Sequence, residues 1–171
     1  MNSRLRGLAP IIDARARVLI LGSFPSVASL AAQQYYGHRQ NQFWLILGAV
    51  LGRPLAEQDY AARRQAVLDA GIAIWDVYRA CEREGSLDAA IRNARRNDFG
   101  CLRELAPRLI RVCFNGQTAA RQAQHLAALG YETRIAPSTS PAYTLPIADK
   151  LAAWSAALLI QSRGAAQCSA Q

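Results

Sequence analysis

Four short apolar runs recur along the chain, and a stretch with helical periodicity separates each run from the next. The runs cover residues 18–21, 72–75, 110–114 and 133–136. Short continuous apolar runs are typical of strands that are buried on both faces, as in a parallel sheet. Strands that alternate with helices favour one such sheet covered by helices on each side. We therefore predict an α/β protein, a three-layer α/β/α sandwich with a central four-stranded parallel sheet.

The stretches between these runs predict helices. The predicted helices cover residues 41–51, 58–70, 117–129 and 149–161. Gly130 suits the end of the third of them, because a helix often ends on a glycine with a positive φ. A further helix is predicted to start at residues 86–88, where Ser86 is a good N-cap and Asp88 suits the first turn. We expect one domain over residues 1–161 and a tail over 162–171 without fixed structure.

The chain is basic, and nearly all of its positive charge is carried by arginine. Its 171 residues include 20 Lys and Arg against 12 Asp and Glu, a formal net charge of +8, and Lys150 is the one lysine. Such a balance favours anionic partners, nucleic acid before acidic membrane surfaces. A GC-rich genome, which raises Arg and Ala together, is an equally open explanation. The same choice holds for Arg92, Arg95 and Arg96, which either follow a DNA backbone or lie on a solvated helix face.

Membrane and metal-dependent classes are not expected. No stretch is long and apolar enough to span a bilayer, and the first residues lack the apolar segment of a secretory signal, so we expect a cytoplasmic protein. The four cysteines form no Cys-x-x-Cys pair, and the two histidines are distant from them in sequence. This spacing predicts no metal site.

Polar, turn-forming segments follow each of the four apolar runs directly. They are residues 22–26, 76–78, 115–117 and 137–143. The carboxyl ends of parallel strands open on one edge of the sheet, which is where α/β proteins bind ligands. The first segment leads into residues 35–44, rich in aromatic and amide side chains that can stack on a base and hydrogen-bond its edge. We expect the chemistry of the protein at this edge.

Several familiar sites are excluded by the motifs. The chain has no Gly-x-x-x-x-Gly-Lys-Ser/Thr loop, and Gly22-Ser23-Phe24 does not open a Gly-x-Gly-x-x-Gly fingerprint. A serine hydrolase would need a Gly-x-Ser-x-Gly elbow, which is also missing.

Five ordered blocks resemble the uracil-DNA glycosylase superfamily, and most closely its hypoxanthine-DNA (deoxyinosine) glycosylase branch. The blocks are Gly22-Ser23-Phe24-Pro25-Ser26, Tyr35-Tyr36-x-His38-x-x-Asn41-Gln42-Phe43-Trp44, Trp75-Asp76-Val77, Phe114-Asn115-Gly116 and Pro137-Ser138-Thr139-Ser140-Pro141-Ala142. The resemblance extends over about residues 17–154. It implies a four-stranded parallel sheet between helices, as predicted above. It also implies a monofunctional enzyme that flips a deaminated base, hypoxanthine first, out of DNA and hydrolyses its N-glycosidic bond to leave an abasic site.

The resemblance implies roles for individual residues. Asn41 would orient the attacking water, because Phe24 stands where the uracil-active branches have an Asp or Asn. The expected base-binding residues are Gly22, Ser23, Phe24, Tyr36 and Asp76. The expected DNA contacts are Ser26, Ser138, Thr139, Ser140 and Pro141. Two alternatives stay open: Asn41 could N-cap the helix after it, and Asp76 could cap the following turn. We expect Asn115 to hold the turn after the third strand, and the three tryptophans to lie in the core.

The chain departs from the uracil pattern in its last loop. Ala136 stands where strongly uracil-active relatives carry a histidine that stabilises the departing base, so we expect weak uracil activity or none. Tyr143 leaves the wedge residue open. Lys150 lies at a helix start with no apolar pocket evident, so we expect no Schiff-base chemistry and a monofunctional enzyme.

The resemblance implies no metal and no other cofactor, and it implies DNA, double- or single-stranded, as the partner. We expect a monomer associated with the nucleoid. Two other interpretations remain open. One is a uracil or mismatched-pyrimidine glycosylase on the same fold, and the other is a DNA- or nucleotide-binding module without chemistry.

Overall fold

The four apolar runs form one parallel sheet, as predicted. In the computed structural model, which describes residues 4–159, its strands are β2 (Val18–Gly22), β3 (Ile72–Asp76), β6 (Arg111–Asn115) and β7 (Glu132–Ala136). Their order is β3-β2-β6-β7, and every neighbouring pair is parallel. All four carboxyl ends therefore lie on one edge. The tail predicted at 162–171 lies outside the described residues.

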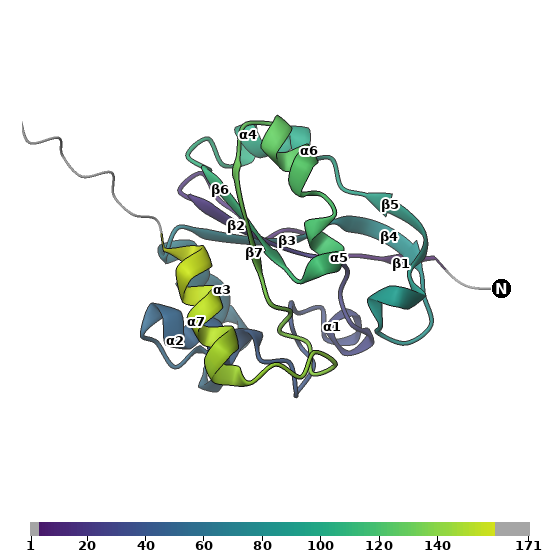
Figure 1. Ribbon diagram of the computed structural model, residues 1–171, viewed down its shortest axis with the longest axis horizontal. Coiled ribbons are helices and arrows are strands. Elements are labelled where there is room, and N and C mark those ends of the chain that lie inside the picture. Colours follow the sequence, from purple (N-terminus) through teal and green to yellow (C-terminus); the bar gives the residue numbers. More distant parts are fainter. Residues whose placement is uncertain (1–3, 160–171) are drawn as a thin grey trace, which may run out of the picture.

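Helices cover both faces of this sheet (Figure 1), so the predicted three-layer sandwich is confirmed. One layer contains α2 (Phe43–Leu51), α3 (Tyr60–Asp69), α7 (Ile147–Leu158) and the short 3-10 helix η1 (Leu55–Glu57). The other contains η3 (Phe99–Cys101), α4 (Leu102–Leu105), α5 (Gln117–Ala120) and α6 (Ala123–Ala128). Successive residues of a strand point to opposite faces. In β2, Val18 and Ile20 accordingly face the first layer, whereas Leu19 and Leu21 face the second.

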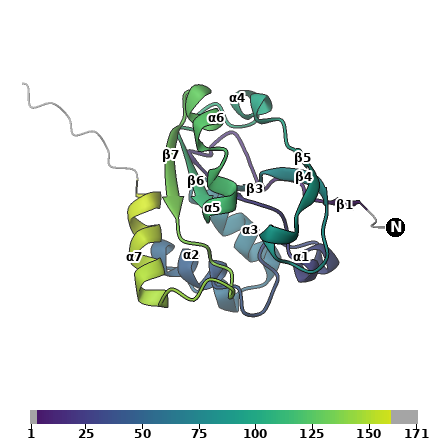
Figure 2. The ribbon, with the colours of Figure 1, turned by 45° about the vertical axis from the view of Figure 1, so that its right-hand side comes forward.

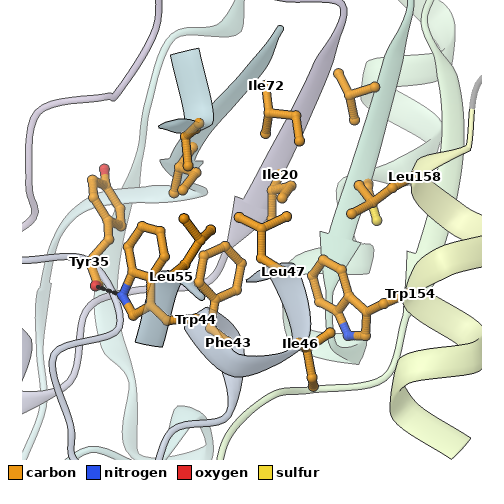
Figure 3. Close-up of a cluster of buried hydrophobic side chains, with 14 of the residues drawn as sticks. Ile20, Tyr35, Phe43, Trp44, Ile46, Leu47, Leu55, Ile72, Trp154 and Leu158 are labelled. Carbon is orange, nitrogen blue, oxygen red and sulfur yellow. Dashed lines mark hydrogen bonds between the residues drawn. The ribbon is translucent and has the colours of Figure 1, made fainter. Parts of the chain in front are cut away.

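The first layer packs its aromatic side chains directly onto the sheet (Figure 3). Phe43 lies edge-on to both Trp44 and Trp154, with ring centroids 5.0 Å and 6.0 Å away. The Trp44 indole donates a hydrogen bond of 3.0 Å to the backbone carbonyl of Tyr35. All three tryptophans, Trp75 included, are buried, as the sequence predicts. These contacts fix the start of α2 and the segment before it against the sheet.

A second, antiparallel sheet was not predicted. It consists of β1 (Leu5–Arg6), β4 (Tyr78–Glu82) and β5 (Arg92–Arg96), in the order β1-β4-β5. Only Val77 separates β3 from β4, so the chain passes almost directly from one sheet into the other. Every residue of β5 is exposed, so this strand lacks the alternation of apolar and polar residues that marks a half-buried strand. Arg92, Arg95 and Arg96 therefore lie on an exposed edge strand and not on a helix face, and their contact with a DNA backbone stays a prediction.

Two helix predictions were wrong in detail. Residues 86–88 do not start an α-helix: only a 3-10 turn, η2 (Asp88–Ala90), forms there before β5 begins. The stretch 117–129 is two short helices, α5 and α6. An i→i+3 hydrogen bond of 3.1 Å from the Gln122 amide to the Ala119 carbonyl tightens the chain between them. Gly130 does follow the second helix with a φ of 96°, as expected.

Candidate active site

A pocket of about 450 Å³ opens at the carboxyl edge of the parallel sheet. Its walls come from the turn after β2, the segment before α2, the end of β3, the connection between β4 and β5, and the loop after β7. Figure 2 shows that connection, in teal, beside α1 (Val27–Ala32). Eleven residues predicted to form the site all line this pocket: Gly22, Ser23, Phe24, Ser26, Tyr36, Asn41, Asp76, Ser138, Thr139, Ser140 and Pro141.

Gly22, Tyr36 and Asp76 converge on one side of the pocket. A Cβ atom at Gly22 would lie 2.5 Å from Asp76 Oδ1 and 3.1 Å from the Tyr36 hydroxyl, so only glycine fits between them. Tyr36 has a φ of 54°, which side chains rarely adopt. Its ring stacks on Phe43 at a centroid distance of 3.8 Å and an angle of 20°. The helix start and the strained backbone therefore hold the phenol beside the carboxyl.

Two polar atoms here have no hydrogen-bond partner among the described residues. They are Asp76 Oδ2 and the Tyr36 hydroxyl, and both are buried. Buried polar groups in native proteins are nearly always bonded, and an unbonded one in a pocket calls for a ligand or water. Asp76 is only 4% exposed. Burial above all, and then Asp88, raises the pKa of Asp76 to about 7.

A carboxyl with this pKa is partly protonated near neutral pH and can then donate as well as accept a hydrogen bond. Burial, followed by the charge of Asp76, also raises the pKa of Tyr36, which keeps its phenol protonated. The pair can thus offer two donors and an acceptor to one bound molecule.

Phe24 contributes an aromatic wall. Its ring is buried, and the Arg83 guanidinium lies 5.1 Å from the ring centroid. Arg83 also donates a hydrogen bond to the carbonyl of Pro25. A cation on the ring and a bond to the next residue hold this turn in place.

Asn41 is fixed at the start of α2. Its Oδ1 accepts a hydrogen bond of 3.0 Å from the amide of Phe43, the first residue of the helix. Gln42 occupies the N-cap position without a side-chain bond, so Asn41 serves as a cap from one residue earlier. The amide oxygen keeps a second lone pair. Capping and a role in the pocket are compatible in this geometry.

The loop after β7 is held from inside the protein. Asn115 donates 3.0 Å to the Thr139 hydroxyl and accepts 3.0 Å from the Thr139 amide. Thr139 is buried, and its carbonyl accepts from the Gln42 amide at 3.0 Å. Asn115 therefore holds the loop, as expected. The Thr139 hydroxyl accepts its bond from Asn115 and keeps its own O–H, so the DNA contact expected at Thr139 stays a prediction.

The family model described as the uracil DNA glycosylase superfamily matches residues 9–160. The chain belongs to this superfamily. A protein of Methanosarcina barkeri named hypoxanthine DNA glycosylase is 38% identical over 152 residues, covering 89% of this chain and 96% of that protein. One of the same name from Methanosarcina acetivorans is 40% identical over 137 residues, 80% of this chain and 87% of that protein.

A solved structure agrees with this family. The solution NMR structure of a candidate uracil DNA glycosylase from Methanosarcina acetivorans superposes with a TM-score of 0.82 at 36% sequence identity. The match covers 90% of this chain and 96% of that one.

In this superfamily member, Lys150 lies in the first turn of α7, as predicted, but its side chain is buried. It is 1% exposed, and its ammonium donates to Gln42 Oε1 at 2.9 Å and to the Tyr143 carbonyl at 2.7 Å. A weaker bond of 3.4 Å reaches the Ser140 carbonyl. Burial lowers the pKa of Lys150. The lysine ties the loop after β7 to the start of α2 and does not line the pocket.

Sequence reasoning missed the residues that the second sheet brings to the pocket. The connection from β4 to β5 contributes Ser86, Leu87, Asp88 and Ala89 to its wall. Asp88 Oδ1 accepts a hydrogen bond of 2.7 Å from the Ser23 hydroxyl, across 65 residues of sequence. Ser86 and Asp88 are residue types that cap helices, but here their side chains bond to other parts of the chain. Only the tertiary structure shows whether such a side chain caps a helix or makes a distant contact.

Between residues 4 and 159, no group of three or more His, Cys, Asp and Glu side chains is placed to hold a metal ion. Within the same residues, no helix is both long and apolar enough to cross a membrane.

Proposed function

We propose that this chain is a monofunctional DNA glycosylase that flips a deaminated base, hypoxanthine first, out of DNA and hydrolyses its N-glycosidic bond. The observation that carries the proposal is the pocket itself, whose wall holds two buried polar atoms without protein partners. The relatives named hypoxanthine DNA glycosylase support the choice of base. The product would be free hypoxanthine and an abasic site.

The donors and acceptors of Asp76 and Tyr36 suit a keto edge. Hypoxanthine presents N1–H, a donor, beside O6, an acceptor. A protonated Asp76 accepts from the first and donates to the second, and the Tyr36 hydroxyl supplies a further donor for O6. Adenine carries an amino group in place of O6, so the phenol would meet no acceptor there. Leaving a buried donor unpaired discriminates strongly between otherwise similar ligands.

Phe24 and Asn41 complete the proposed mechanism. Phe24 stacks on the flipped base, and Arg83 keeps the ring in place from the protein side. Asn41 Oδ1 accepts from the water that attacks C1′ of the sugar. An amide takes no proton, but bond breaking at the sugar is advanced in such reactions, so orientation of the water matters more than its deprotonation. The water supplies hydroxyl to C1′, and its proton replaces the sugar on the departing base.

The loops around the pocket would bind the DNA backbone. Ser138 and Ser140, half-buried in the loop after β7, accept hydrogen bonds from the amides of Ser140 and Ala142 and keep their own O–H groups for phosphate. Pro141 is exposed beside them. Ser26 caps α1 by accepting from the Ser29 amide at 3.1 Å and donating to the Ser29 hydroxyl. Because both of these bonds lie within the protein, Ser26 would support DNA binding mainly by holding the turn before α1 in shape.

The test is cleavage of labelled duplexes that contain hypoxanthine or uracil, in EDTA, with and without hot alkali. We expect breaks at hypoxanthine that appear only after alkali, because the enzyme leaves the strand intact. We also expect no trapping of the protein on DNA by borohydride, since Lys150 is buried outside the pocket. Breaks without alkali, or a trapped adduct, would contradict the monofunctional mechanism.

Uracil is the second candidate substrate. A solved relative is described as a candidate uracil DNA glycosylase, and uracil presents the same pair, N3–H beside O4. Ala136 supplies no charge to stabilise a departing uracil anion, so we expect hypoxanthine to be cut faster. Cutting mainly at uracil would reverse this order. Binding of either duplex without cutting would favour a binding module instead.

The proposed substrate also indicates where in the cell the protein acts. Repair of chromosomal DNA would occur in the cytoplasm at the nucleoid. We propose that the protein acts on DNA as a monomer.

A further inference from the structure

Among residues 4–159, two carboxyl side chains line the pocket, and they differ in depth. Asp76 ends β3 and is buried, whereas Asp88 is half-buried on the connection between β4 and β5. The buried Oδ2 of Asp76 has no partner among these residues, and the proposed reading of the base uses it. The greater exposure of Asp88 places it closer to the mouth, where the sugar of a flipped nucleotide would lie.

Asp88 is held in place without being neutralised. Its Oδ1 accepts a hydrogen bond of 2.7 Å from the Ser23 hydroxyl, and the Ser86 hydroxyl beside it accepts one of 3.0 Å from the Val27 amide. A hydroxyl that donates to a carboxylate orients the group but leaves its charge unpaired. In the described part of the chain, Asp88 forms no ion pair, and no arginine or lysine lines the pocket.

The two carboxyl groups are set apart by their surroundings. Burial, followed by the negative charge of Asp88, raises the pKa of Asp76 to about 7. Near neutral pH the pocket therefore combines a carboxyl that holds a proton with one whose charge acts on it. Paired carboxyl groups in different environments commonly divide the work of a reaction between them. The base reading proposed above occupies Asp76 and leaves Asp88 without a role.

Hydrolysis of a glycosidic bond creates a positive charge that such a carboxylate can stabilise. As the bond from C1′ to the base nitrogen breaks, its electron pair leaves with the base, and positive charge spreads over C1′ and O4′. A fixed negative charge stabilises this state more than the neutral nucleotide. We infer that Asp88 is a catalytic residue whose carboxylate stabilises the positive charge on the deoxyribose while Asn41 orients the water.

This inference rests on the proposed function and keeps its balance of atoms. Asp88 takes no proton: the water gives hydroxyl to C1′, and its proton replaces the sugar on the base. The residue lies outside every block that suggested the family, and the fold brings it to the pocket through the bond to Ser23.

Asp88 could instead serve only to anchor its connection, and D88N separates the two roles. The amide retains an oxygen that accepts from Ser23 but carries no charge. We expect single-turnover cleavage of hypoxanthine at saturating DNA to fall by about thirtyfold or more, with binding of the same duplex no weaker. The matched control is E84Q, because Glu84 is exposed on the same connection, does not line the pocket and loses the same charge.

A binding measurement tests the charge without any cleavage. One duplex carries a pyrrolidine ring with a protonated nitrogen in place of the target sugar, and the other carries a neutral tetrahydrofuran ring. The comparison uses D76N and D76N/D88N, so that position 76 is uncharged in both. We expect D76N to bind the cationic duplex about tenfold or more tighter than the neutral one, since it resembles the transition state. In D76N/D88N this preference should fall to within about twofold, and in D76N/E84Q it should persist.

Two results would overturn the inference and leave the proposed function intact. One is an unchanged cleavage rate in D88N. The other is a slower rate with an unchanged preference for the cationic duplex, which would assign Asp88 to anchoring alone. D88S, which also retains an acceptor without the charge, repeats both measurements should D88N fail to fold. An unaltered protein that cuts neither hypoxanthine nor uracil overturns the proposed function and the inference together.

Discussion

Asn41 and Asp76 illustrate how one residue serves both the fold and the proposed chemistry. Asn41 bonds to the first amide of α2, and this bond also fixes the direction of its side chain. Asp76 ends β3, where the sheet buries it without giving Oδ2 a partner. The first arrangement stabilises the fold, whereas the second costs stability. Both can be tested with single substitutions.

Replacing Asn41 with Ala should lower the cleavage rate by about a hundredfold or more, because the attacking water loses its orientation. DNA binding, measured by fluorescence anisotropy, should change little. N41S separates the two roles, since serine is also a good capping acceptor but is too short to hold the same water. Full activity in N41S would mean that capping alone explains Asn41. The exposed neighbour Gln40, changed to Ala, serves as the control.

Asp76 should make stability depend on pH. Its pKa rises from 3.8 to about 7 on folding, so between these values the folded state binds more protons than the unfolded state. Stability should therefore fall as the pH rises from about 4 to about 7 and should be lowest, for this group, above about 7. D76N should remove that part of the dependence and raise Tm at pH 8. Asp149, which is exposed, provides the control variant D149N.

The same variant tests base reading. An amide at position 76 retains one donor group and one acceptor, like the protonated acid. We expect D76N to keep hypoxanthine cleavage and to lose the decline in rate above neutral pH, whereas D76A loses cleavage. An alkaline decline that persists in D76N would show that another group controls it.

At the level of elements, the site depends on loops that are fastened to rigid helices and strands. The loop after β7 is bonded to Asn115 at the end of β6, to Lys150 in α7 and to Trp154, whose indole donates 2.9 Å to the Pro137 carbonyl. The connection from β4 to β5 is bonded to the turn after β2. Both rims of the pocket are thus positioned by hydrogen bonds to side chains of other elements.

Lys150→Met should loosen the first of these loops. It removes the ammonium that bonds to Gln42 Oε1 and to the Tyr143 carbonyl, and it leaves both acceptors without this donor. We expect a loss of about 2–4 kcal/mol in the free energy of unfolding. Hydrogen exchange should become faster over residues 137–146, and KM should rise more than kcat falls. A W154F variant, which removes one anchor of the same loop, should act in the same direction and more weakly.

At the scale of the whole molecule, two hydrophobic clusters pack against the two faces of the parallel sheet, and polar loops follow the strands at its carboxyl edge. The pocket draws on segments that span residues 22 to 143. The net charge of the whole chain is +8. Whether the arginines bind DNA or merely reflect base composition is a question about the whole surface.

The salt dependence of DNA binding distinguishes these two explanations of the arginine excess. Each phosphate that the protein neutralises should contribute about −0.9 to the slope of log K against log salt concentration. We expect a slope steeper than about −3 for hypoxanthine-containing duplex, which means several phosphate contacts. A slope near zero, measured by anisotropy from low to high salt, would assign the arginine excess to composition alone.

The sequence by itself determined the sheet, most of its helices and the set of loops that form the site. Its apolar runs are continuous because the strands are buried on both faces, and the turns after them must share one edge because the strands are parallel. Five blocks of residues along that edge were enough to indicate the family.

Only the tertiary structure decided the second sheet, the part played by residues 86–89, and the places of Lys150 and Thr139. β5 is exposed throughout and so has no apolar pattern to read. Ser86 and Asp88 are residue types typical of a helix start. In the fold, however, their side chains accept hydrogen bonds from the distant Val27 amide and Ser23 hydroxyl and do not cap a helix. The sequence pattern around Lys150 is that of a surface charge, and only the fold shows that its ammonium is buried and bonded to oxygens of Gln42, Ser140 and Tyr143. Local patterns report propensity, whereas these outcomes depend on which distant groups the fold brings within bonding distance.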